Sequence, residues 1–135
     1  MSSTDVYTTV HDAAGTELVA NALVNTYTTG NQGYYGALGT TALEDGGFLV
    51  TWQSDGHGAD TTGYGIFGQR YNLDGTPAGN EFQINVYTKY TQYFPAVATI
   101  PGEGFVVTWY SQAQDDSVSG VFAQRYDAAG NKLYH

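Results

Sequence analysis

Acidic side chains gather in two corresponding segments of the chain, each of which follows a run of strand-forming residues. The segments cover 54–60 and 111–117, and the acids are Asp55, Asp60, Asp115 and Asp116. Calcium takes about six to eight oxygen ligands, which Asp-rich flexible turns can supply. The pattern therefore suggests calcium sites in these two loops. The alternative is that the acids are solvated turn residues, because Asp, Asn and Gly are favoured in turns for local reasons.

Aromatic side chains form a second group of candidates, with glutamines beside them in two further segments. The rings belong to Tyr34, Tyr35, Tyr90, Tyr93 and Phe94, and the amides to Gln32 and Gln92. Sugars stack their C–H faces on rings and exchange hydrogen bonds with amides. We therefore expect a sugar-binding surface made by Tyr34, Tyr35, Gln32, Tyr93, Gln92 and His57. The alternative is that these rings only pack the loops.

His57 lies between Asp55 and Asp60 and could act as a base. Catalysis by a base also requires an orienting partner and a group to activate. The second repeat has no matching histidine, and the sequence contains no nucleophile elbow, phosphate-binding glycine loop, zinc motif or paired-carboxylate motif. We therefore expect a protein that is not an enzyme, with His57 among its ligand-binding residues.

The elements that position these residues are repeated. Phe48–Ser54 (FLVTWQS) returns as Phe105–Ser111 (FVVTWYS), which places Trp52 and Trp109 57 residues apart. Gly65–Tyr71 returns as Gly120–Tyr126 at an offset of 55. Repeats of this size are typical of supersecondary units that bury their apolar faces by stacking on copies of themselves. We expect both tryptophans to lie in the core and not in a ligand site.

Runs of β-formers bounded by Gly, Asn, Asp and Pro predict four strands in each repeat. They cover about 22–27, 37–43, 48–54 and 64–71 in the first repeat, and 81–88, 95–100, 104–111 and 120–126 in the second. Val6–Gly15 aligns with Val121–Gly130, which predicts one further strand at the N-terminus. The expected division is an N-terminal strand within 1–15 that closes or swaps onto a blade, a first repeat at 16–75 and a second at 76–135.

The expected fold is all-β, with two four-stranded antiparallel units as blades of an oligomeric propeller. Two blades cannot close a ring, because propellers need at least about four. A trimer of the chain would supply six blades and a tetramer eight, so we expect a homo-oligomer. A β-sandwich that holds both repeats is the alternative.

Composition limits the partners. Thirteen acidic and four basic residues give a formal charge of −9, which opposes binding to nucleic acid or to anionic lipid. The chain has no cysteine, no apolar run of membrane-spanning length and no N-terminal signal peptide. We therefore expect neither disulfides nor membrane insertion.

Both arginines, Arg70 and Arg125, occupy the same position of the repeat. Arginine pairs with carboxylates through two parallel hydrogen bonds, which suggests a recurrent structural partner such as Asp45 or Glu103. The alternative is recognition of an anionic ligand.

The repeat motifs carry a resemblance to a known group of proteins. The motifs are Asn85–Thr88, Gln92, Pro95–Ala98, Gly104–Trp109 and Gln124–Gly130. Over roughly Leu18 to Asn131 they resemble repeats of large secreted bacterial surface proteins, which often lie beside RTX calcium-binding and cadherin-like modules, and are similar to rhizobial adhering proteins. The resemblance implies an extracellular or cell-surface location, export without a signal peptide, adhesion or polysaccharide binding, and calcium as a cofactor. The rival hypothesis is a structural assembly module with no small ligand.

Overall fold

The protein consists of short antiparallel strands in a computed structural model that describes residues 5–11, 13–25, 32, 38–55, 64–85, 92–112 and 119–133. The first five strands are β1 (Tyr7–His11), β2 (Glu17–Leu23), β3 (Leu38–Ala42), β4 (Phe48–Asp55) and β5 (Tyr64–Tyr71). The others are β6 (Phe82–Gln83), β7 (Gln92–Ile100), β8 (Gly104–Gln112), β9 (Ser119–Tyr126) and β10 (Lys132–Leu133). No helix in the described part of the chain is long and apolar enough to cross a membrane. The expected all-β class is confirmed.

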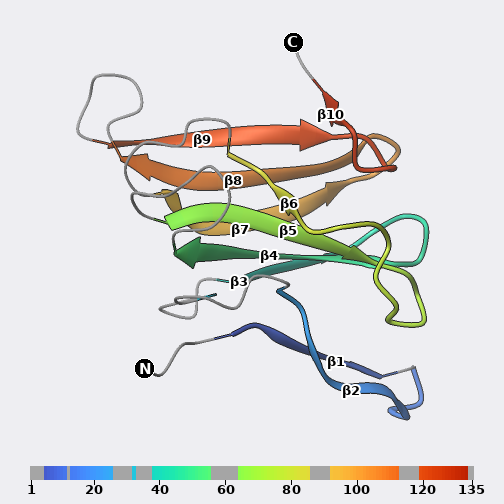
Figure 1. Cartoon of the computed structure of the whole chain (residues 1–135). Coiled ribbons are helices and arrows are strands. Elements are labelled where there is room, and N and C mark those ends of the chain that lie inside the picture. The colour runs from blue at the N-terminus through green and yellow to red at the C-terminus, as the bar shows by residue number, and fades with distance from the viewer. Residues whose placement is uncertain are drawn as a thin grey trace.

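The strands form three antiparallel sheets (Figure 1). We call β1–β2 the N-terminal hairpin, the four strands β3-β4-β5-β6 the first sheet, and β7-β8-β9-β10 the second sheet. Within the two larger sheets, each strand pairs with its neighbour in sequence. The long central strands β4 and β5, and β8 and β9, lie close to their predicted positions because their apolar residues and turn signals agree.

The grouping of strands differs from the expected units at 16–75 and 76–135. The opening strand of the second repeat, β6, pairs with β5 at the end of the first repeat. The cause is the tight connection after β5, where Gly75 has a φ of 87° and donates to the Asn72 carbonyl at 3.0 Å. A turn this short folds adjacent strands onto each other. The same arrangement pairs β1 with β2.

The N-terminal hairpin reproduces the outer half of the first sheet. The Val6 N–H donates to Oδ1 of Asn25 at 2.7 Å, and the Ile66 N–H donates to Oδ1 of Asn85 at the same distance. The Val6 carbonyl accepts from Val24 at 2.8 Å, and the Ile66 carbonyl accepts from Ile84 at 2.7 Å. Positions 60 residues apart thus have the same backbone partners, and the hairpin is half of a sheet.

Each sheet has two faces, which we name by the first sheet. Its front face carries Leu49 and Ile66, which pack against Phe105, Val107 and Trp109 of the second sheet. Its back face carries Val50, Trp52 and Phe67, which pack against Val6 and Val24 of the hairpin. Successive side chains of a strand alternate between faces, so β4 is covered on both sides.

The three sheets therefore stack in chain order, each front face against the next back face. Strand β7 lies against β3, β4 and β5 across the larger interface. Two ring pairs repeat the packing: Phe48 stacks on Tyr71 at 4.8 Å, and Phe105 stacks on Tyr126 at 4.9 Å between ring centroids. Trp52 and Trp109 are both buried in these clusters, as predicted.

Candidate functional site

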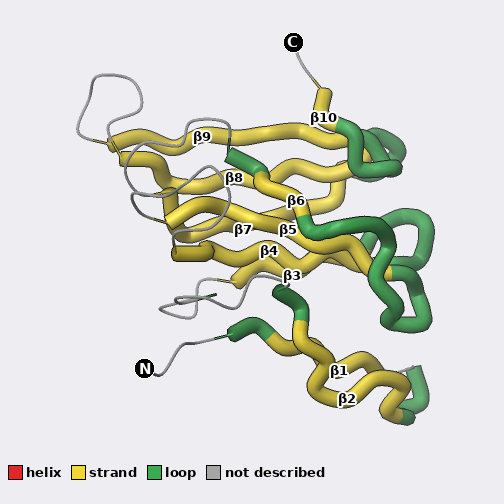
Figure 2. The backbone as a smooth tube through the Cα atoms, viewed as in Figure 1, coloured by secondary structure: helices red, strands yellow, loops and turns green. Residues whose placement is uncertain are grey.

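The candidate ligand residues that the structure describes lie at one edge of the sheets. Asp55 ends β4 opposite Tyr64, and Gln112 ends β8 opposite Ser119, at equivalent strand ends. The described turns lie at the opposite edge, at the right of Figure 2. We call the first edge the loop edge and the second the turn edge. Six expected site residues lie outside the described residues: Tyr34, Tyr35, His57, Asp60, Asp115 and Asp116. For Asp55 and Tyr93 only the backbone is described.

Gln32 and Gln92 occupy equivalent buried positions at the loop edge. Gln32 pairs with Ser54 across an isolated bridge, and Gln92 pairs with Ser111 in the second sheet. The Ser54 hydroxyl donates to Oε1 of Gln32 at 2.5 Å, and both glutamines are buried. Both amides are therefore buried at the loop edge, whereas the sequence suggested an exposed position in a loop. Buried amides with hydrogen-bond partners fix the strand ends that carry the loops.

Phe94 carries an exposed ring at this edge. Its side chain is 56% exposed, and its backbone has a φ of 58°, the only positive φ of a non-glycine residue in the described ranges. The register of β7 on β8 shifts between Tyr93 and Ala96, so Phe94 lies within a bulge. Its N–H donates to Oε1 of Gln53 at 3.0 Å, across the interface between the sheets.

Gln53 is the residue that sequence reasoning missed. It is buried in β4 of the first sheet, where the second repeat has Tyr110. A polar residue within an otherwise apolar repeated run was the available signal. Its amide holds the strained backbone of Phe94, and such strained residues persist only where their surroundings fix them. The loop edge thus presents an aromatic ring at the junction of two sheets.

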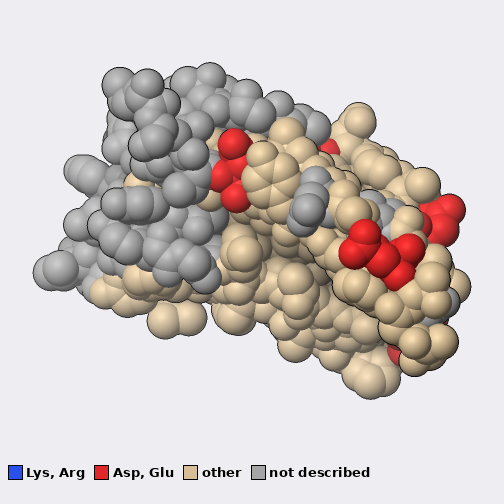
Figure 3. All heavy atoms as spheres, turned by 90° about the horizontal axis from the view of Figure 1, so that it is seen from below, with Lys and Arg blue, Asp and Glu red and all other residues tan. Residues whose placement is uncertain are grey.

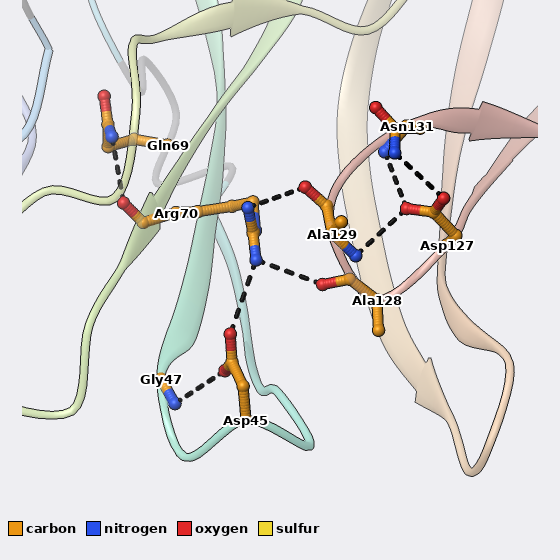
Figure 4. Close-up of polar contacts among 8 residues, drawn as sticks. All are labelled: Asp45, Gly47, Gln69, Arg70, Asp127, Ala128, Ala129 and Asn131. Carbon is orange, nitrogen blue, oxygen red and sulfur yellow. Dashed lines mark hydrogen bonds and ion pairs between the residues drawn. The ribbon is translucent and has the colours of Figure 1, made fainter.

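Arg70 organises the turn edge (Figure 4). Its Nη2 lies 3.4 Å from Oδ2 of Asp45, and Oδ1 of the same carboxylate accepts the Gly47 N–H at 2.9 Å. The same guanidinium donates to the carbonyls of Ala128 at 3.0 Å and Ala129 at 2.8 Å, in the turn of the second sheet. The expected carboxylate partner is confirmed, and Arg70 also joins the two sheets.

Arg125 has the equivalent carboxylate. Its Nη2 lies 3.2 Å from Oε2 of Glu103. Its side chain is 33% exposed, against 18% for Arg70, because no further sheet lies in front of it in this chain. Both ion pairs are therefore structural contacts made by equivalent positions.

Aspartates shape the turns of this edge, one of which accepts Arg70. Asp127 accepts hydrogen bonds from the Ala129 N–H at 3.0 Å and from the Asn131 N–H at 2.9 Å. The side-chain hydrogen bond from Asn131, followed by the backbone bonds, lowers the pKa of Asp127. Hydrogen bonds from Thr76 lower the pKa of Asp74 in the same way. The charged carboxylates therefore stabilise the turns.

Acidic side chains are more frequent toward the turn edge than toward the middle of the face shown in Figure 3, where no lysine or arginine is visible. This face is the side of the N-terminal hairpin in Figure 1. Beside the hairpin, a groove of about 420 Å³ lies between Thr8–His11 and the back face of the first sheet at Thr40 and Phe48. Within the described ranges, no group of three His, Asp or Glu residues is placed to hold a metal ion.

The arrangement offers two kinds of chemistry: an exposed ring among polar groups at the loop edge, and the Arg70 guanidinium aimed at turn carbonyls at the turn edge. Comparison of the chain with protein-family models and with curated proteins finds no match. Functional proposals for this chain therefore rest on its own residues.

Proposed function

We propose that this protein is a non-enzymatic module that binds polysaccharide at its loop edge. The observation that carries the proposal is Phe94, an exposed ring on a left-handed backbone held by a buried glutamine of the neighbouring sheet. A bulky residue in that conformation costs about 1–3 kcal/mol, and such strain concentrates at functional sites. A fixed, solvent-facing ring is suited to stacking on the C–H face of a sugar.

Other residues of the loop edge extend the surface around Phe94. Tyr93 and Asp55 have their backbones at the same edge, and the loops that start there contain Tyr34, Tyr35 and His57. We propose that these side chains provide further rings and hydrogen-bonding groups. Asp55, Asp60, Asp115 and Asp116 supply the carboxylates that calcium prefers, so calcium would order the loops and raise sugar affinity.

The test is binding to a panel of bacterial and plant polysaccharides, with calcium and with chelator. Phe94→Asn removes the ring but keeps a residue type that tolerates the left-handed conformation. We expect saturable binding by the unmodified chain, at least a tenfold loss in Phe94→Asn, and no loss in the control Leu73→Ala, whose exposed side chain lies in a turn at the opposite edge. Tyr34→Ala and Tyr93→Ala locate the remainder of the site.

Two results would reject the polysaccharide proposal. One is the absence of binding to every member of the panel under both calcium conditions. The other is unchanged affinity in Phe94→Asn, which would move the site away from this ring. Equal binding with calcium and with chelator would reject only the proposed role of calcium.

The second candidate function is structural assembly, and the repeated stacking of sheets favours it. Front faces meet back faces twice in this short chain, with the same residue positions at both interfaces. We propose that the sheets are blades of a propeller-like ring that several copies complete, three copies giving six blades and four giving eight. The alternative, a closed β-sandwich, would leave the chain as a monomer. Both candidates are consistent with the proposed place outside the cell or on its surface.

A further inference from the structure

The front face of the second sheet is uncovered in this chain. Val121 occupies the same repeat position as Ile66 and Val6, and its side chain is 74% exposed, whereas those of Ile66 and Val6 are 0% and 3% exposed. Val106 and Thr108 of the same face are only half-buried, although their counterparts Leu49 and Thr51 are fully buried. The same apolar position is therefore buried in the hairpin and in the first sheet but exposed in the second sheet.

The back face of the N-terminal hairpin is uncovered as well. Tyr7 is 58% exposed, whereas Phe67 at the same repeat position is 3% exposed. Leu23 pairs with Tyr7 on this face and is also exposed. His11 is exposed, whereas its counterparts Tyr71 and Tyr126 are buried. The two ends of the stack therefore expose the two kinds of face that meet inside it.

The chain itself shows what covers a front face. The hairpin front face meets the back face of the first sheet, and the front face of that sheet meets the back face of the second. The hairpin contact also shows that two strands are enough to stack on a four-stranded sheet. A third contact of this kind would join the second sheet of one chain to the hairpin of another.

An arginine contact would fix the register of such a contact between two chains. Arg70 donates to the carbonyls of Ala128 and Ala129, in the turn Asp127–Gly130. The hairpin turn has the same sequence, Asp-Ala-Ala-Gly at 12–15, whereas the turn of the first sheet reads Asn-Leu-Asp-Gly. Gly15 has a φ of 86° and Gly130 a φ of 91°, so the two turns share their glycine conformation. Glu103 holds Arg125 as Asp45 holds Arg70.

We propose that copies of this chain associate head to tail: the front face of the second sheet, around Val121, receives the back face of another copy's N-terminal hairpin, and Arg125 donates to the carbonyls of that hairpin's turn at 13–14. The contact is heterologous, because different surfaces of the two copies meet. Charge favours it, since Arg125 and Lys132 lie in the second sheet and the described residues on the hairpin side of the molecule show no lysine or arginine (Figure 3). This association goes beyond polysaccharide binding and does not depend on it.

The test uses two variants that each block one face. Val121→Asp places a charge on the front face, and Tyr7→Asp places one on the hairpin back face, at side chains that are exposed within a single chain. Sedimentation velocity over a hundredfold range of concentration measures the association. We expect concentration-dependent oligomers for the unmodified chain and monomers for either variant alone. An equimolar mixture of the two variants keeps one open face of each kind, so it should form dimers and nothing larger.

Every other outcome overturns the proposal. A monomeric unmodified chain removes it outright, and a monomeric mixture shows that the two faces do not meet. Persisting oligomers in Tyr7→Asp alone would indicate a symmetric contact between two front faces. The control Leu73→Asp alters an equally exposed apolar side chain in the turn of the first sheet and should associate normally.

Discussion

At the scale of single residues, Arg70 makes the most specific contact between the two larger sheets. Its fork bonds a carboxylate of its own sheet and two carbonyls of the next, a geometry that lysine cannot reproduce. We expect Arg70→Lys to lower the free energy of unfolding by about 1 kcal/mol, because hydrogen bonds to a charged group are lost at a partly exposed site. Urea unfolding of dilute protein measures the loss. Arg125→Lys should lower the free energy of unfolding of a single chain by less than Arg70→Lys. Equal losses would argue against the contact between Arg70 and the second sheet.

The turn aspartates predict a response to acid. Hydrogen bonds lower the pKa values of Asp74 and Asp127 below the ordinary 3.8, so the unfolded chain binds more protons than the folded one in that range. Their contribution to stability is complete above the unfolded pKa and is lost as the pH falls through the lower folded pKa. We expect the urea midpoint of the unmodified chain to fall more steeply below about pH 4 than that of the double variant Asp74→Asn, Asp127→Asn. Parallel pH profiles would contradict this.

Gln32 and Gln92 show which part of the candidate site could not be predicted. Glutamine beside tyrosine in a glycine-rich segment is typical of an exposed loop, yet both side chains are buried opposite serines. The pairing joins residues about twenty positions apart, and spacing along one chain does not reveal such a contact. The ion pairs of Arg70 and Arg125 were predictable, because each recurred with an acidic residue in the same turn of its repeat.

At the scale of the elements, the central strands could be predicted and the grouping of strands could not. Alternating apolar residues between turn signals identify β4, β5, β8 and β9 within one or two residues. The repeat boundaries in the sequence do not coincide with the boundaries of the sheets. Pairing follows the tight turns, such as Asn72–Thr76 after β5, so the strand that opens each repeat joins the strand before it.

Two glycines at the same repeat position support the pairing of the central strands, β4 with β5 and β8 with β9. A Cβ atom at Gly47 would lie 2.0 Å from the carbonyl oxygen of Tyr71, and a Cβ atom at Gly104 would lie 2.0 Å from that of Tyr126. Backbone must move to admit a methyl group there, so we expect Gly47→Ala and Gly104→Ala each to cost at least about 2 kcal/mol. Thermal and urea unfolding measure the loss. Gly102→Ala is the control, since its Cβ would meet nothing within 4 Å and only its positive φ is strained. Equal costs at all three sites would refute the packing argument.

At the scale of the whole molecule, the protein is a stack of sheets that ends in two unlike open faces. The same front-to-back contact occurs twice inside the chain, and the residues that would form it a third time are exposed at both ends. Stacking of identical units gives a ring when the rotation between units closes, and a filament when it does not. Either assembly would display many copies of the loop edge, and multivalent display raises the avidity of weak sugar sites.

The native mass of the unmodified chain tests the stacking account most directly. Native mass spectrometry or light scattering over a range of concentrations gives the number of chains in each species. A discrete trimer or tetramer is the result we expect, because six or eight four-stranded sheets, with the two-stranded hairpins stacked between them, would complete a ring. A chain that stays monomeric at every concentration would contradict the account, since its two open faces would then have no affinity for each other.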